Sequence, residues 1–150
     1  MFNFLKKKNK NENKEVEKNT ELLSKTASLL IHAAKMDQKY SDEEKEIIRK
    51  TMIELGCEDD SIDEMLIIAE KNESDSNQIL DFTREIKNTD DNFKTKLIEA
   101  LWKIIFSDNK ADMYESSLMR RLAGLLYLDN KTVGEIKEQI KKKLNQWLIL

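Results

Sequence analysis

From residue 19 onward, apolar residues recur at three- and four-residue intervals, which is the spacing of one face of an α-helix. Strand-type alternation does not occur over a useful length. The chain of 150 residues also has three glycines and no proline, whereas all-β folds depend on these residues for many of their turns. We therefore predict an all-α fold of about seven helices, which form one compact domain over residues 19–150.

The predicted helices begin at a recognisable pair of residues. Ser, Thr or Asp at the start, with Glu three positions later, forms a capping box in which each side chain accepts a backbone N–H. Gly56 is predicted to end the second helix, because glycine readily adopts the left-handed backbone that stops a helix. The predicted caps are Ser41 with Glu44, Ser61 with Glu64, Ser74 or Asp75, Asp90 or Asp91, Asp112 with Glu115, and Thr132 with Glu135.

An internal repeat emerges when the chain is shifted by 71 residues, without any gap. Helix caps and loop charges then coincide, which predicts two pseudo-symmetric helix–loop–helix–helix units packed against each other. The identical pairs include Lys25/Lys96, Leu30/Leu101, Asp37/Asp108, Lys39/Lys110, Glu44/Glu115, Arg49/Arg120, Leu55/Leu126 and Glu64/Glu135.

The densest shared segment places two carboxylates seven residues apart across a short loop, once in each unit. These residues are Asp37 with Glu44 and Asp108 with Glu115. Asp at the end of a helix accepts backbone N–H groups and fixes a turn, which is the structural interpretation. Alternatively, the four oxygen-bearing side chains bind a hard cation such as Ca²⁺ or Mg²⁺.

The doubled pattern of an aliphatic helix ending in Asp, a short loop, Ser/Asp-x-x-Glu and a second aliphatic helix resembles the tellurite-resistance TerB-like family. Segments 29–44 and 101–115 carry the likeness, which extends over about residues 20–140. The resemblance implies a seven-helix domain whose acidic loop positions are a suspected metal or interaction site. It maps that site onto Asp37, Glu44, Asp108 and Glu115. The family usually has Gly directly after each Asp, where this chain has Gln and Asn.

Residues 1–18 form a separate segment, predicted to be flexible and basic, with six lysines and three glutamates. Its apolar tip and lysines would suit reversible contact with an anionic membrane surface. That tip and its basic run consist of Phe2, Phe4, Leu5, Lys6, Lys7 and Lys8.

Composition restricts the possible functions further. One histidine and one cysteine exclude the two-histidine and multi-cysteine zinc motifs, and the acidic excess of residues 19–92 disfavours nucleic-acid binding. The longest apolar run, residues 122–128, is far shorter than the ~20 residues of a membrane span, so a cytoplasmic location is expected, with the inner membrane face as an alternative.

Together with the resemblance, these observations predict a non-enzymatic helical module. It would scaffold or signal in a bacterial stress-response complex linked to tellurite or other chemicals, with other proteins as its partners. Two alternatives remain open. One is a peripheral membrane adaptor, and the other is a hydrolase that uses carboxylate pairs for acid–base chemistry.

Several single residues carry separate expectations. His32 is predicted to be an exposed surface residue. Cys57 is predicted to be a small buried hydrophobe, because it aligns with Leu128 in the repeat. A reactive thiol is disfavoured, since the acidic residues that follow would raise its pKa. Arg49 and Arg120 are predicted to pair with the loop carboxylates. The aromatic residues at helical spacing, predicted to belong to the core, are Trp102, Phe106 and Trp147.

Overall fold

The computed structural model describes the backbone of residues 19–37, 40–76, 78–107 and 113–149, and the side chains of 19–36, 40–76, 78–107 and 117–145. These residues form seven α-helices and two short 3-10 helices, with no strand among them. The all-α prediction is confirmed. In chain order the elements are the N-terminal helix (residues 19–34), η1 (Lys35–Asp37), α2 (Asp42–Glu54), α3 (Ile62–Asp75), α4 (Ile79–Thr83), η2 (Ile86–Asn88), α5 (Asp91–Ser107), α6 (Met113–Leu125) and α7 (Asn130–Ile149).

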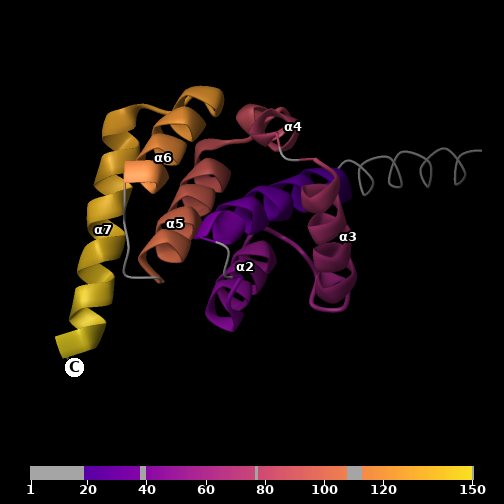
Figure 1. Cartoon of the computed structure of the whole chain (residues 1–150), viewed down its shortest axis with the longest axis horizontal. Helices are drawn as coiled ribbons and strands as arrows, with labels where there is room; N and C mark the ends of the chain where they lie inside the picture. Colours follow the sequence, from indigo (N-terminus) through magenta and orange to yellow (C-terminus); the bar gives the residue numbers. More distant parts are fainter. Residues whose placement is uncertain (1–18, 38–39, 77, 108–112, 150) are drawn as a thin grey trace, which may run out of the picture.

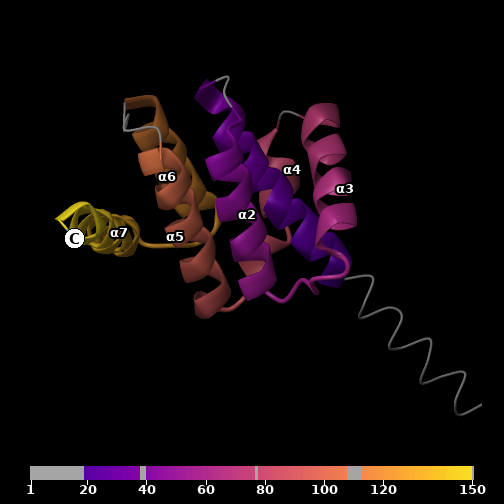
Figure 2. The same ribbon diagram turned by 90° about the horizontal axis from the view of Figure 1, so that it is seen from below.

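The helices pack side by side, with α3 at one edge of the molecule and α7 at the other (Figures 1 and 2). Helix α5 contacts both α2 and α7, and α6 contacts α7 and the short helix α4. The N-terminal helix runs between α2, α3 and α5, where it is covered on several sides (Figures 1 and 2). Because neighbouring helices cover this helix, residues 26–31 are all buried, including the two hydroxyl-bearing residues Thr26 and Ser28.

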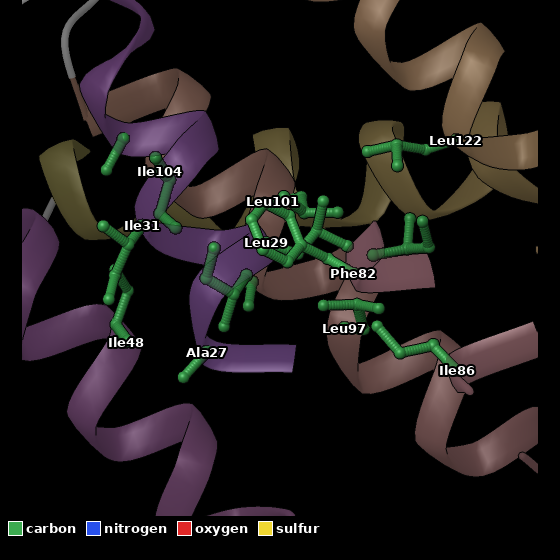
Figure 3. Close-up of a cluster of buried hydrophobic side chains, with 14 of the residues drawn as sticks. Ala27, Leu29, Ile31, Ile48, Phe82, Ile86, Leu97, Leu101, Ile104 and Leu122 are labelled. Carbon is green, nitrogen blue, oxygen red and sulfur yellow. The ribbon is translucent and has the colours of Figure 1, made fainter. Parts of the chain in front are cut away.

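The core is one continuous cluster of mainly aliphatic side chains, which also contains the rings of Phe82 (Figure 3) and Trp102. Each fully buried large apolar side chain stabilises the fold by about 1.5–3 kcal/mol relative to exposure. The labelled contributors are Ala27, Leu29 and Ile31 of the N-terminal helix, Ile48 of α2, Phe82 of α4, Ile86 of η2, Leu97, Leu101 and Ile104 of α5, and Leu122 of α6.

Two predicted capping boxes with the same sequence pattern differ in the structure. Ser41 has an extended backbone, and its side chain and that of Glu44 exchange hydrogen bonds with each other's backbone N–H, as predicted. Ser61 has helical backbone angles, φ −103° and ψ −9°, and makes no side-chain cap hydrogen bond. The second prediction was wrong, because a cap hydroxyl reaches the next turn only from a non-helical backbone.

Of the other predicted helix caps, some are present in the structure and others are not. Asp90 caps α5, because its carboxylate accepts the backbone N–H of Phe93 at 2.8 Å. The predicted cap of α7 at Thr132 was wrong, because the helix begins at Asn130. Asp129 caps it instead, since its carboxylate accepts the backbone N–H of Lys131 at 3.1 Å. Neither Ser74 nor Asp75 opens a helix, because both belong to the last turn of α3. The predicted pair Asp112 with Glu115 lies outside the described side chains.

Helices α2 and α6 end in the same hydrogen-bonded turn. After α2, the N–H of Gly56 donates to the carbonyl of Ile53 and the N–H of Cys57 to that of Met52, at 3.1 and 2.9 Å. After α6, the corresponding bonds are Tyr127 to Gly124 and Leu128 to Ala123, at 3.3 and 2.8 Å. Gly56 has φ 115° and Tyr127 has φ 58°, so both residues adopt positive φ, as the Schellman turn requires.

Candidate functional site

Glu44 is a fully buried carboxylate at the start of α2. Its Oε1 accepts hydrogen bonds from both the backbone N–H and the hydroxyl of Ser41, each at 2.9 Å. In return, the hydroxyl oxygen of Ser41 accepts the N–H of Glu44 at 3.1 Å. A buried carboxylate is stable only when such donors replace water. Oε1 of Glu44 therefore holds the first turn of α2, which is its predicted role in the capping box.

The other three candidate ligands lie outside the described side chains. Asp37 is the last residue of η1, so its backbone is placed but its side chain is not described. Asp108 falls in the gap before α6, and Glu115 lies in the first turn of α6 without a described side chain. Among the residues that the structure does describe, no three His, Cys, Asp or Glu side chains gather closely enough to hold a metal ion. The four-residue cation site therefore stays a prediction.

A small pocket adjoins Glu44 on the outer surface of α2 and α3. Tyr40 forms one wall, and the ammonium of Lys45 lies 5.0 Å from the centre of its ring. Burial, followed by the carboxylates of Glu70 and Glu44, raises the pKa of Tyr40 to about 12. The phenol is therefore neutral at physiological pH.

Glu73 of α3 is a second buried carboxylate, and the sequence considerations above missed it. One oxygen pairs with the ammonium of Lys35 at 3.0 Å, and the other lies 3.4 Å from Nδ1 of His32. His32 is therefore half-buried between α3 and the ring of Phe82, whose centre is 6.3 Å away. The prediction that His32 is an exposed surface residue was wrong.

The sequence did contain a signal for Glu73. Its position continues the apolar stripe of α3 through Ile62, Met65 and Ala69, all of which are buried. A charged residue in register with an apolar helix face is usually buried with a partner of opposite charge. The partner lies 38 residues earlier in the chain, a distance that helical periodicity alone does not reveal.

Arg49 is predicted to pair with the acidic loops, and the structure gives it a partner on another helix. Arg49 of α2 forms an ion pair with Asp63, in the first turn of α3. This hydrogen bond and the charge of Asp63 raise the pKa of the Arg49 guanidinium. The predicted pairing of Arg49 and Arg120 with the loop carboxylates stays a prediction, since the side chains of Asp37, Asp108 and Glu115 lie outside the described residues.

A cavity of about 520 Å³ opens where the N-terminal helix meets the end of α3 and α4. Glu21 and Glu85 face each other there, and burial, followed by the charge and hydrogen bond of Glu21, raises the pKa of Glu85. Lys25 lies at the same cavity and donates to the carbonyl of Asp81 at 3.3 Å. In the described chain, this carboxylate pair comes nearest to an acid–base arrangement.

Cys57 and two core aromatic residues match the predictions. Cys57 is buried, and burial raises the pKa of its thiol, with Glu58 and Asp59 adding to the shift. Trp102 is buried and its indole stacks on Phe106, with ring centres 5.8 Å apart. Trp147 lies outside the described side chains.

One known protein family matches most of the chain. The family described as Tellurite resistance protein TerB matches residues 23–138. The chain belongs to the TerB family. No match was found among curated proteins or among solved structures.

The TerB match covers both acidic loops, and therefore all four predicted cation ligands. It does not cover residues 1–18, the proposed membrane-contacting segment, whose side chains lie outside the described residues. No helix in the described parts of the chain is long and apolar enough to cross a membrane. Sequence reasoning thus identified the family, whereas the buried Glu73 cluster and the Arg49 ion pair required the structure.

Proposed function

We propose that this TerB-family chain is a non-enzymatic helical module that scaffolds or signals in a tellurite or chemical stress response. The observation that carries the proposal is that three of its charged side chains hold helices in place. Glu44 caps a helix, Glu73 joins two helices through Lys35, and Arg49 ties α2 to α3. These side chains are engaged in holding the helices together, which suits a rigid platform for other proteins.

The outer face of α3 offers a surface for such a partner. Ile67 and Ile68 are 69% and 43% exposed, and α3 forms one edge of the molecule (Figure 1). Neighbouring large aliphatic residues left in water on one helix are typical of interaction surfaces when they belong to a larger patch. A partner helix or loop that covers them would gain burial energy without any rearrangement of the core.

A complementation experiment tests the proposed role. Cells lacking the protein are challenged with tellurite and supplied with the parent chain, an Ile67→Ser/Ile68→Ser variant, or a Glu64→Gln control on the same helix. We expect the parent and the control to restore growth and the double variant to fail, although its melting temperature is unchanged. Full protection by the double variant would refute the α3 surface, and no protection by the parent would refute the stress-response role.

For the acidic loops we propose turn-fixing as the role of Asp37 and Asp108 and helix capping as the role of Glu44. The alternative is Ca²⁺ or Mg²⁺ binding by Asp37, Glu44, Asp108 and Glu115. Thermal unfolding with each cation, on the parent and an Asp37→Asn/Asp108→Asn variant, separates the two. A cation at 100 times its Kd should stabilise the parent by about 2.7 kcal/mol. An unchanged parent with a destabilised variant supports turn-fixing, whereas a cation-dependent shift lost in the variant supports the alternative.

We also propose that the two halves of the domain derive from one repeated unit. The matching turns after α2 and α6 support it, as do the bounds of these two helices, which coincide after a shift of 71 residues. Core positions agree as well. The pairs in which both residues are buried include Ala27/Ile98, Leu30/Leu101, Ile48/Met119, Met52/Ala123, Ile62/Val133, Met65/Ile136 and Ala69/Ile140.

The membrane-adaptor alternative concerns residues outside the structure described here, Phe2, Phe4, Leu5 and Lys6–Lys8. Co-sedimentation with anionic and neutral liposomes tests it, with the full chain compared to a chain lacking residues 1–18. Binding to anionic liposomes that disappears with the truncation would favour the adaptor. Equal behaviour of the two chains would exclude it.

A further inference from the structure

A pocket of about 510 Å³ lies between α5, α6 and α7, three helices that stand side by side (Figure 1). Its apolar lining comes from side chains that are themselves buried, Trp102, Met119 and Val133. Two cations, Arg120 and Lys137, share the pocket with the amide of Asn130 and the backbone of Gly134. Among the residues with described side chains, no carboxylate lines it, although more than a third of the residues in the chain are charged.

One of the two cations is held against the aromatic wall of the pocket. The ammonium of Lys137 lies 5.3 Å from the centre of the Trp102 ring. That ring is fixed in turn by a hydrogen bond from its Nε1 to the carbonyl of Val133 at 3.1 Å. Among the described residues, no acidic side chain forms an ion pair with Arg120 or Lys137. Two cations beside an apolar surface attract an anion.

The corresponding place in the first half of the domain is built differently. Arg49 precedes Arg120 by 71 residues, and it lines a pocket that contains three carboxylates. Arg49 is also neutralised by Asp63, whereas the residue 71 positions after Asp63 is Gly134. The second half therefore has no acid at the position of Asp63, which pairs with Arg49 in the first half. It also has Lys137 where the first half has Leu66.

We propose that the pocket between α5, α6 and α7 binds a small organic anion, a phosphate or carboxylate carried on an apolar group. Arg120 and Lys137 bind the charged end, because a guanidinium presents paired donors to phosphate and carboxylate oxygens. The indole edge, Met119 and Val133 contact the apolar end. The volume of the pocket falls within the usual range of small-molecule sites.

Isothermal titration calorimetry at low ionic strength tests the proposal, with phenyl phosphate and benzoate as probes. We expect saturable one-to-one binding of at least one probe to the parent chain. Arg120→Gln should weaken that binding about tenfold or more, since a hydrogen bond to a charged group is lost. Arg49→Gln is the matched control in the first half and should leave the affinity unchanged.

Gly134 provides a second test that leaves both cations in place. Its backbone is helical, and a Cβ added there meets no atom within 4 Å, so substitutions fit without strain. Gly134→Asp restores the acid of the first half and should abolish binding by pairing with Arg120, whereas Gly134→Ala should bind as the parent does. The proposal is overturned if neither probe binds the parent saturably, or if Arg120→Gln and Gly134→Asp both bind with parental affinity.

Discussion

The turns that end α2 and α6 have the same hydrogen bonds but different residues at the position of positive φ. Gly56 occupies it in the first turn and Tyr127 in the second. A side chain with a Cβ makes the left-handed backbone costly by roughly 1–2 kcal/mol, whereas glycine avoids this strain. The second turn therefore forms because packing of the flanking helices compensates for strain at Tyr127. The geometry is set by where the helices must end, and glycine only lowers its energy.

The starts of α2 and α3 give the opposite comparison. Ser41 and Ser61 are each followed by Glu three residues later, yet only Ser41 forms a cap. Here the residues agree and the geometry differs, because Ser61 belongs to a tight turn that keeps its backbone helical. A local motif thus predicts a structure only where the chain on either side allows the required backbone.

The largest expected effect comes from removing the glycine of the first turn. Gly56→Ala forces an L-residue to φ 115°, which should lower the free energy of unfolding by about 1–2 kcal/mol. Open space surrounds the position, since an added Cβ meets no atom within 4 Å, so backbone strain alone accounts for the loss. Urea unfolding at constant m-value measures it. An unchanged midpoint would mean that the first turn tolerates a side chain as readily as the second.

Next in size is the loss of a helix cap. Ser41→Ala removes the hydroxyl that accepts the N–H of Glu44 and donates to its buried carboxylate, so we expect a loss of about 1 kcal/mol. Ser61→Ala is the matched control, because Ser61 makes no side-chain cap hydrogen bond and should lose almost nothing. Equal losses from the two variants would show that the difference between the two helix starts does not matter for stability.

Local sequence patterns predicted the helices and the α2 cap well, since these depend on residues within a few positions of one another. Apolar periodicity identified the core helices, and Gly56 identified the end of α2. The resemblance to the TerB family also rested on a local sequence motif, and the TerB match confirms the family.

What the sequence did not reveal depends on contacts between distant segments. The pairing of Glu73 with Lys35 joins α3 to the end of the first helical segment, and the ion pair of Arg49 with Asp63 joins α2 to α3. Each needs the packing of two helices to be known first. The candidate cation site stays a prediction because only Glu44 of its four side chains is described.

A smaller effect, of opposite sign, is expected in the second turn. Tyr127→Gly relieves the strain of φ 58° and should raise the free energy of unfolding by about 0.5 kcal/mol. The gain is reduced because the ring of Tyr127 contacts the ammonium of Lys87, 5.9 Å from its centre. Lys87→Gln reports the value of that contact separately. Destabilisation by Tyr127→Gly beyond that of Lys87→Gln would mean that Tyr127 is not strained.

The smallest effect concerns the residue after each of these positions, Cys57 in the first turn and Leu128 in the second. Burial raises the pKa of the Cys57 thiol above its unfolded value, so the folded state holds the proton more tightly. The resulting stability is fully present below the unfolded pKa and is lost as pH rises through the folded pKa. Between pH ~8.5 and the folded pKa, the parent should therefore lose stability that Cys57→Leu keeps, because the variant carries the second turn's residue and has no thiol to titrate. Paired urea titrations of the two proteins at neutral and alkaline pH measure this difference, in which the titration of all other groups cancels. Parallel pH profiles would show that the thiol ionises as readily in the folded chain as in the unfolded one, and that the two turns differ only at Gly56 and Tyr127.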